Sequence, residues 1–547
     1  MSHPGISRLL ALLPFGALLL AQTPGSAPPP TPIFKSTTRI VLVDVVATDR
    51  NGKPVHDLKS ADFTVLDEGK PQGIVAFEEQ RSDAAALRQT ALNLPDNVYT
   101  NYVSRSQPGA LTVLLFDSLN TDRLDLPYAR NEMLGFLRKL PPGQPVALYA
   151  LGSHLRMVHS FTENSDELIA AARQLSNHSH LTYSNMKEFS AAIGELKESP
   201  VSTTRMFRRM VESLGEEYEG KLESRSQDTL DALSQLARAL AVVPGRKNLI
   251  WISGGFPFDI SSNARGLQKV AAQLAATRIA VYPVDVRGVA ALNADGLTRD
   301  SEIFLQTQSY EALSGRGQEN DSIVETMRYI AGLTGGRARV NSNDLAGAIA
   351  DSMHTGSNYY TLAYRPATTE WNGKFRRIAV KTSRLNVKLL HRSGYYATPD
   401  TFDSRKDAGR TVAMAMQPTV PTATQLIMKA RVVPGRITGE ASKIDILIDV
   451  HDLSLTEEKE LKTPEVQFVA VAWDAGGKQC ASFSQAFNSA LPPTQLESLL
   501  RTGLQLHQEM LLKPGSYQVR LGVMDRLSGR IGTLDVPLTI GPGIPTK

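Results

Sequence analysis

Strand-like and helix-like hydrophobic patterns alternate along residues 109–398, and this alternation constrains the fold more than any other feature. Continuous apolar runs such as residues 111–116 ("LTVLLF") and 279–285 ("IAVYPVD") are typical of strands that are buried on both faces. Between such runs, apolar residues recur at helical spacing, as in residues 126–140 and 206–241. The alternation predicts an α/β fold with a doubly wound, mostly parallel sheet and right-handed crossovers.

The two flanking regions have the patterns of β-structure. Residues 36–82 contain β-branched runs broken by turn signals, which predict a small N-terminal β module. Residues 418–541 contain at least five strand-like runs spaced as in a β-sandwich. A polar stretch over residues 81–108 and a linker over residues 400–417 separate these regions from the central one.

The first residues have the pattern of an export signal. Arg8 precedes an apolar stretch from Leu9 to Ala21, so residues 1–21 are expected to be a signal peptide and residues 22–35 a Pro-rich tether. We therefore expect an exported protein of the periplasm or the extracellular space, with no integral membrane segment after signal cleavage. Because Cys480 is the only cysteine, no internal disulfide can form, and folding must depend on hydrophobic cores.

The charge balance argues against nucleic acid as a partner. The chain has 59 basic and 55 acidic residues, and its formal net charge is +4. It contains no basic run and no interleaving of basic and aromatic residues of the kind that tracks a phosphate backbone. Neither DNA nor RNA is expected to bind.

The segment "LLFDSLNTD", residues 114–122, ends an apolar strand in a cluster of polar side chains. Asp117 is followed closely by Ser118, Asn120 and Thr121. Ligands of open α/β sheets bind at the carboxyl ends of the strands, which is where this cluster is expected. Two interpretations remain open: a metal or ligand site, or a turn whose polar groups cap the next helix, for which Asp125 is a suitable N-cap.

Several long motifs carry a family resemblance. The segments "VLLFDSLNT", "NLIWISGG", "IAVYPVD" and "IAGLTGGRARVNSNDLAGAI" are similar to those of secreted bacterial proteins called VWFA-related, of the acidobacterial type, which contain a von Willebrand factor type A-like domain. The resemblance covers residues 36–398, and the flanking segments "VVATDRNGKPVHDLKSADFTVLDEGKPQGIVAFEE" and "NYYTLAYRP" take part in it. It implies an α/β type A-like domain over residues 109–398 that binds other proteins.

The resemblance also implies a site for Mg²⁺ or another divalent ion. The family pattern is Asp-x-Ser-x-Ser, a distant Thr and an Asp at a strand end; Asp117, Thr121 and Thr229 match its first, fifth and distant positions. Leu119 and Gly254 stand where a Ser and the second Asp belong. Because each missing ligand weakens a site for a hard cation, we expect no cofactor. The alternative is Mg²⁺ or Ca²⁺ bound weakly by a degenerate site of these three residues.

Two polar insertions, residues 177–205 and 288–320, are expected at the same edge of the sheet as Asp117 and to form a recognition surface. The polar residues expected to line a partner-binding rim at this edge are Ser118, Asn120, Ser253 and Asp259. A protein partner would dock on this combined surface.

The sequence lacks a phosphate loop, a His-Glu-x-x-His motif and a Gly-x-Ser-x-Gly nucleophile turn, so we expect no enzyme. We interpret the chain as an exported, non-enzymatic protein-binding or adhesion protein. One alternative is a structural assembly factor of the envelope that uses the edges of its sandwich for β-augmentation. The other is an unrecognised hydrolase with its site on the rim of the sheet.

Overall fold

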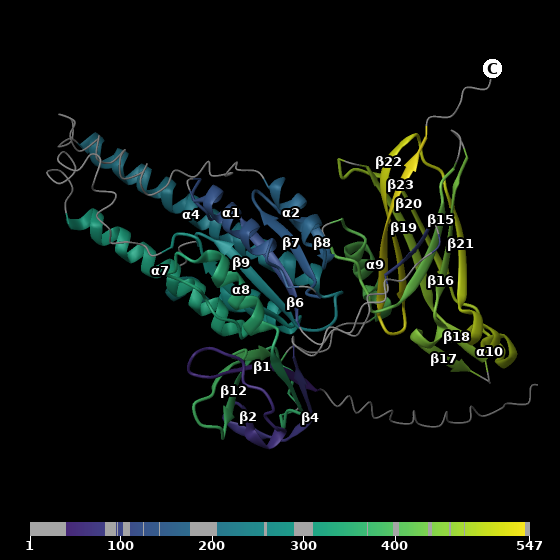
Figure 1. The fold of residues 1–547 in the computed structure, drawn as a ribbon, viewed down its shortest axis with the longest axis horizontal. Helices are drawn as coiled ribbons and strands as arrows, with labels where there is room; N and C mark the ends of the chain where they lie inside the picture. Colours follow the sequence, from purple (N-terminus) through teal and green to yellow (C-terminus); the bar gives the residue numbers. More distant parts are fainter. Residues whose placement is uncertain are drawn as a thin grey trace, which may run out of the picture. The chain divides into compact units, whose positions relative to one another are not determined.

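The computed structural model in Figure 1 contains helices and several β-sheets, which confirms the expected mixed α/β character. None of the helices in the part of the chain that it describes is long and apolar enough to cross a membrane. The structure describes residues 40–541 except 82–94, 96, 102–109, 124, 142, 176–204, 256–259, 289–309, 369, 398–403, 419, 436–439, 459–460 and 475. The predicted signal peptide and tether lie outside the described residues.

The central region is built on a five-stranded sheet in the order β10-β9-β6-β7-β8. Its strands are β6 (Leu111–Asp117), β7 (Val146–Leu151), β8 (Leu155–Thr162), β9 (Lys247–Ser253) and β10 (Ile279–Asp285). The first four strands of that order are parallel, and the edge strand β8 runs antiparallel to β7. The carboxyl ends of β6, β9 and β10 therefore lie at one edge of the sheet.

Helices cover both faces of this sheet. They are α1 (Leu126–Leu137), α2 (Ser165–Arg173), α4 (Arg205–Leu240), α5 (Ile260–Ala276), α7 (Tyr310–Thr334) and α8 (Leu345–Gly356). Alternate side chains of β6 point to opposite faces: Val113 and Leu115 pack with α4, α5 and α7, whereas Leu114 and Phe116 pack with α1, α2 and α8. Burial on both faces explains why β6 is a continuous apolar run.

The N-terminal strands do not form a separate module, which corrects the boundaries expected from the sequence. They are β1 (Val41–Thr48), β2 (Phe63–Asp67), β3 (Lys70–Gln72) and β4 (Ile74–Gln80). They pair with strands that follow α8, namely β11 (Tyr359–Tyr364), β12 (Phe375–Thr382), β13 (Lys388–Leu390) and β14 (Gly394–Tyr396).

The resulting two sheets have the orders β13-β1-β11-β4 and β14-β12-β2-β3, and they share one core. Residues 36–82 are too few to bury a core alone, so they complete one with strands about 300 residues away. The helices and strands of the α/β part consequently end at Gly356 rather than at residue 398.

The C-terminal region has two four-stranded antiparallel sheets, ordered β21-β16-β15-β5 and β20-β19-β22-β23, and a small β17-β18 pair. The strands of the two larger sheets are β5 (Val98–Thr100), β15 (Met428–Val433), β16 (Ser442–Ile448), β19 (Val466–Asp474), β20 (Gln479–Phe487), β21 (Leu504–Met510), β22 (Gly515–Asp525) and β23 (Ile531–Ile540). The remaining elements are α9 (Ser404–Ala415), α10 (Pro493–Thr502), β17 (Leu455–Glu458) and β18 (Leu461–Pro464). The two larger sheets share one core. The edge strand β5 of the first of these sheets comes from the stretch expected to be a polar connection, residues 81–108, and pairs with β15.

The second polar insertion is partly helical. We expected residues 288–320 to form a loop, but α7 begins at Tyr310, so only residues 289–309 remain outside the described part of this segment. For the first insertion, residues 177–204 lie outside the described residues and Arg205 begins α4.

A partly buried ion pair joins β1 to the start of β10. The Arg278 guanidinium donates to both oxygens of Asp44, with Nε–Oδ2 and Nη2–Oδ1 distances of 3.0 and 2.6 Å. The Thr361 hydroxyl donates to Asp44 Oδ1 at 2.9 Å, and Arg246 Nη1 lies 3.9 Å from Oδ2. Burial by itself would raise the pKa of Asp44, but the hydrogen bond from Arg278 and the two cationic charges hold it below its ordinary value.

Lys247, at the start of β9, is a buried lysine that caps the end of α4. Its Nζ donates to the carbonyl oxygens of Leu240 and Val243, at 3.3 and 2.6 Å. Burial, together with the charge of Arg278, lowers the pKa of Lys247 to about 7.

We expect Lys247 to make the protein more stable as the pH rises from 7 toward 10. In this window the unfolded chain holds a proton on this lysine and the folded protein does not, so the slope approaches about 1.4 kcal/mol per pH unit. Lys247→Met should remove most of this slope in chemical denaturation measured at pH 7, 8.5 and 10. An unchanged slope would show that Lys247 keeps its proton in the fold.

Candidate functional site

The carboxylate of Asp117 is the centre of a buried polar cluster at the carboxyl edge of the sheet. The residue is 1% exposed. Its Oδ1 accepts hydrogen bonds from the backbone N–H groups of Leu119 and Asn120, both at 3.0 Å. Its Oδ2 accepts from Asn120 Nδ2 at 2.8 Å, Trp251 Nε1 at 2.9 Å and Ser253 Oγ at 2.8 Å. Five donors therefore point at one carboxylate.

The two bonds to Oδ1 fold the chain after β6 into a tight turn, because an aspartate that accepts from N–H groups two and three residues ahead fixes the local backbone. Thr121 closes this turn: its hydroxyl donates to the Asp117 carbonyl at 2.5 Å. The same hydroxyl accepts from the Gly254 N–H at 2.9 Å, which ties the turn to the end of β9.

Thr229 joins the cluster from α4, although it lies more than 100 residues away in the sequence. Asn120 Nδ2 donates to Thr229 Oγ1 at 2.9 Å, and that hydroxyl donates to the Arg225 carbonyl at 2.8 Å. The structure thus brings Asp117, Thr121 and Thr229 together, as the type A resemblance implies. The Asn120 amide bridges two of them.

Trp251 and Ser253 are the donors whose role the sequence did not suggest. Trp251 belongs to an apolar run, which predicts a core residue, and its ring is indeed fully buried. Ser253 was expected on an accessible rim. Both belong to the buried strand β9 beside β6, so the one available signal is that side chains with N–H or O–H groups interrupt and end the apolar run that follows Asn248.

Desolvation dominates the electrostatics of the site. Burial raises the pKa of the Asp117 carboxyl above its ordinary value, although the hydrogen bonds from Asn120, Ser253 and Trp251 each favour the charged form. The cluster is therefore a carboxyl group that is stabilised by neutral donors in a dry environment.

These residues do not fit a divalent cation. A metal ligand needs a free lone pair directed at the ion, and both oxygens of Asp117 are surrounded by donors that the cation would repel. A side chain at Gly254 has no space either, because a Cβ there would lie 2.7 Å from the Asn120 carbonyl oxygen. Within the described residues, no group of three acidic, His or Cys side chains could hold a metal.

The predicted partner-binding rim is not accessible, which corrects that expectation. Ser118, Asn120 and Ser253 are all buried, and each makes a hydrogen bond inside the cluster or to a neighbouring strand. The fourth member, Asp259, lies outside the described residues. Burial follows from the turn: Asn120 and Ser253 face the Asp117 carboxylate, and Ser118 faces the Leu151 carbonyl of β7, rather than solvent.

Helix α7 covers the rim from one side. A Cβ at Gly255 would meet the side chains of Ile323 and Met327 at 2.2 and 2.9 Å, and both of these α7 residues are buried. Gly255 has a φ of +76°, so glycine is required here for its backbone conformation as well. The covering helix explains why a polar strand end is dry.

Of two neighbouring acids, Asp285 has a structural role and Asp125 does not form the expected cap. Asp285, at the end of β10, accepts from Arg287 Nε at 2.9 Å and from Nη2 at 2.8 Å, and so forms an ion pair within a turn. Asp125 precedes α1 but makes no side-chain capping hydrogen bond, so the N-cap expected for it is not formed. The turn is held by Asp117 instead.

No protein-family model matches the chain, and a search of curated proteins finds no match. Among solved structures, it is similar to an aerotolerance-related membrane protein from Bacteroides fragilis NCTC 9343, with 12% identity over 45% of this chain and 98% of that one and a TM-score of 0.24. A von Willebrand factor type A protein from Catenulispora acidiphila is 12% identical over 60% and 75%, with a TM-score of 0.17. The pilus adhesin SpaC from Lactobacillus rhamnosus GG is 8% identical over 75% and 54%, with a TM-score of 0.23. Likenesses of this size carry no conclusion about fold or function.

Proposed function

We propose that this chain is an exported, non-enzymatic protein-binding protein, and that its partner docks on the helices that extend beyond the carboxyl edge of the α/β sheet. The sequence resemblance to type A-like domains supports the general role. The apolar stretch from Leu9 to Ala21 supports export. The degenerate cation site has no part in the proposal.

The observation that carries the proposal is the length of α4. Thr229 lies at the level of the rim, because it contacts Asn120. The helix from there to Leu240 packs on the sheet. Residues 205–228 therefore continue about 36 Å beyond the rim at 1.5 Å per residue.

Helix α7 supports the same arrangement. Its Ile323 and Met327 meet the rim at Gly255, so residues 310–322 continue about 20 Å past it. Figure 1 shows α4 and α7 leaving the sheet on the same side. Long helices beyond a domain core present a large surface without disturbing that core, which suits recognition of another protein.

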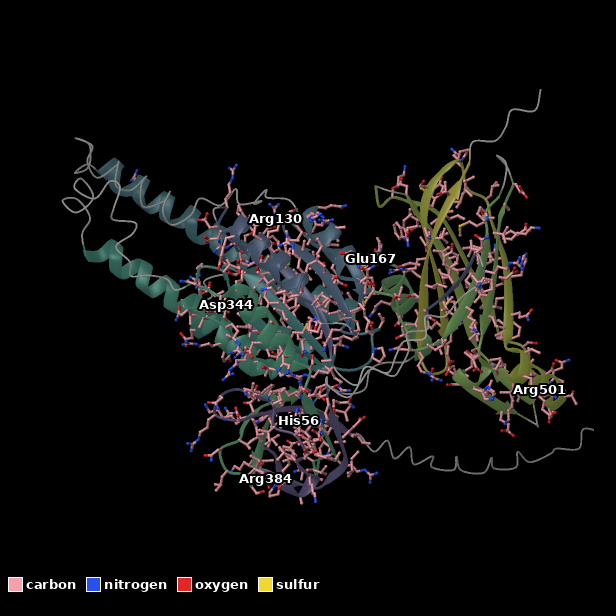
Figure 2. All side chains as sticks on the ribbon, in the orientation of Figure 1. His56, Arg130, Glu167, Asp344, Arg384 and Arg501 are labelled. Carbon is pink, nitrogen blue, oxygen red and sulfur yellow. The ribbon has the colours of Figure 1, made fainter. Side chains whose placement is uncertain are left out.

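Site-specific photo-crosslinking in the native envelope tests this proposal. A photoreactive amino acid in place of Arg209 or Glu223, both exposed on α4, should give one and the same adduct. The matched control is Arg501, an exposed arginine of α10 that is labelled in Figure 2. Adducts from Arg501 alone, or equal adducts from all three positions, would contradict a docking surface on α4.

A further inference from the structure

The outer edge of β20 has no charged residue and no proline to protect it, and the one irregularity in its pairing with β19 is a bulge at Cys480, near the start of the strand. β20 ends its sheet and pairs only with β19 in the described part of the chain. Its nine residues, "QCASFSQAF", include no charged residue, no proline and no glycine. A free row of N–H and C=O groups recruits another strand unless charge, proline or shortness prevents it.

The other edge strands show that this chain does protect its edges. Every other described edge strand of more than three residues contains a charged residue or a proline. These strands and residues are β4 with Glu78, β8 with Arg156, β10 with Pro283, β17 with Glu457, β18 with Lys462, β21 with Glu509 and β23 with Pro537. The remaining edge strands have three residues each. β20 is the exception.

We propose that β20 pairs antiparallel with β20 of a second copy of this chain, across a two-fold axis that passes through Phe483. The two four-stranded sheets then become one sheet of eight strands. The inference does not depend on the proposed function of α4 and α7, because it concerns a different sheet.

The sequence around Phe483 favours a second copy as the occupant. An axis at Phe483 places Ser482 opposite the partner's Ser484, and Ser484 opposite the partner's Ser482. These side chains are small, uncharged and exposed, so the pairing meets no like charges and permits cross-strand hydrogen bonds between hydroxyls.

The two faces of β20 also match under this symmetry. Ala481, Phe483 and Phe487 pack toward the core of the region. Because directly opposed residues of antiparallel strands lie on the same face, the two Phe483 side chains stay on the inner face of the joined sheet. The inner apolar rows of the two copies therefore continue across the junction.

The same axis separates the two free thiols. Cys480, which is exposed, would oppose the partner's Ala486 and lie about 20 Å from the partner's Cys480 along the strands. The dimer is therefore held by strand pairing and not by a disulfide. An edge-to-edge contact buries little surface, so we expect a Kd on the order of micromolar.

Sedimentation velocity of the mature chain in reducing buffer, over about 1–200 µM, tests the proposal. Wild type should show a monomer–dimer equilibrium that persists in Cys480→Ser. Ser482→Lys/Ser484→Lys places lysine opposite lysine twice and should weaken the dimer at least about tenfold. Ser482→Lys/Ser484→Glu is the matched control: it places lysine opposite glutamate twice and should retain the dimer.

A wild type that stays monomeric over the whole range would overturn the proposal. So would a dimer that disappears with reductant, or equal dimerisation of the two double variants, since the axis at Phe483 requires them to differ. Thermal melting of both variants establishes that they are folded, so that loss of the dimer can be assigned to lost pairing between the two β20 edges and not to unfolding of β20.

Discussion

Asp117→Ala is expected to lower the free energy of unfolding by about 3–5 kcal/mol, because it leaves several buried donors without an acceptor. Trp251 Nε1, Ser253 Oγ and the backbone N–H groups of the turn would all lose their partner in a site that water does not reach. Urea denaturation of the purified protein measures the change. A loss below about 1 kcal/mol would show that the cluster is hydrated.

Two further variants distinguish a buried hydrogen-bond cluster that stabilises the fold from a cation site. Asp117→Asn keeps the shape but directs an amide N–H₂ at donors, so it should still cost about 2–3 kcal/mol. Asp125→Ala is the matched control. It removes an aspartate at the start of α1 and should change stability by less than about 0.5 kcal/mol, because its side chain makes no capping hydrogen bond. Adding Mg²⁺ should not raise the Tm of wild type; a rise that Asp117→Ala abolishes would restore the metal interpretation.

The raised pKa of Asp117 gives the cluster a particular pH dependence. The folded protein binds a proton on this carboxyl more readily than the unfolded chain does. Its contribution to stability is therefore fully present below about pH 4 and is lost as the pH rises through the raised pKa. Asp117→Asn should lack this loss.

Asp44→Ala is expected to cost about 2–4 kcal/mol, because it leaves the buried charge of Arg246 and the partly buried charge of Arg278 without their carboxylate. Arg278→Lys should cost less but not nothing, since an ammonium group cannot form both bonds of the guanidinium fork. Glu78→Ala is the matched control, because Glu78 is exposed and lies in the same cross-strand row as Asp44. Equal losses for Asp44→Ala and Glu78→Ala would contradict the role of the ion pair.

The pH dependence from Asp44 has the opposite sign to that from Asp117. The pKa of Asp44 is held below its ordinary value, so its contribution is present above about pH 4 and is lost as the pH falls through the folded-state value. Asp44→Asn should therefore flatten the acid limb of a stability-against-pH curve. Denaturation measured between pH 2 and pH 5 checks this, and an unchanged acid limb would count against it.

Local patterns predicted the four parallel strands of the α/β sheet well, because these strands are buried on both faces and are therefore continuous apolar runs, whereas the half-exposed edge strand β8 was missed. β6 and β9 are the clearest examples. The pairing partners of the N-terminal strands could not be predicted in the same way. β1 is as apolar, but its partners β11 and β13 follow the α/β part. Pairing across such a distance leaves no signal in either segment alone. β5, three residues long, pairs with β15 and was missed for the same reason.

For the candidate site, the sequence predicted which residues meet but not how accessible they are. The convergence of Asp117, Thr121 and Thr229 follows from strand ends and a family pattern. Their burial depends on Trp251, whose indole N–H is hidden in an apolar run, and on α7, whose residues Ile323 and Met327 close over Gly255. A turn and a metal site use the same residue types, so only the direction of the donors distinguishes them.

Gln80 at the end of β4 and Tyr359 at the start of β11 are direct neighbours across the ladder of one sheet. The chain thus leaves the two N-terminal sheets after β4 and returns to them at the neighbouring strand β11, and the stretch between these points contains β5 and the whole α/β part. The stretch between β4 and β11 can therefore be replaced or lengthened in evolution without a change in the pairing of the two strands that flank it. Besides these chain connections, the ion pair between Asp44 of β1 and Arg278, next to β10, joins the two parts through side chains.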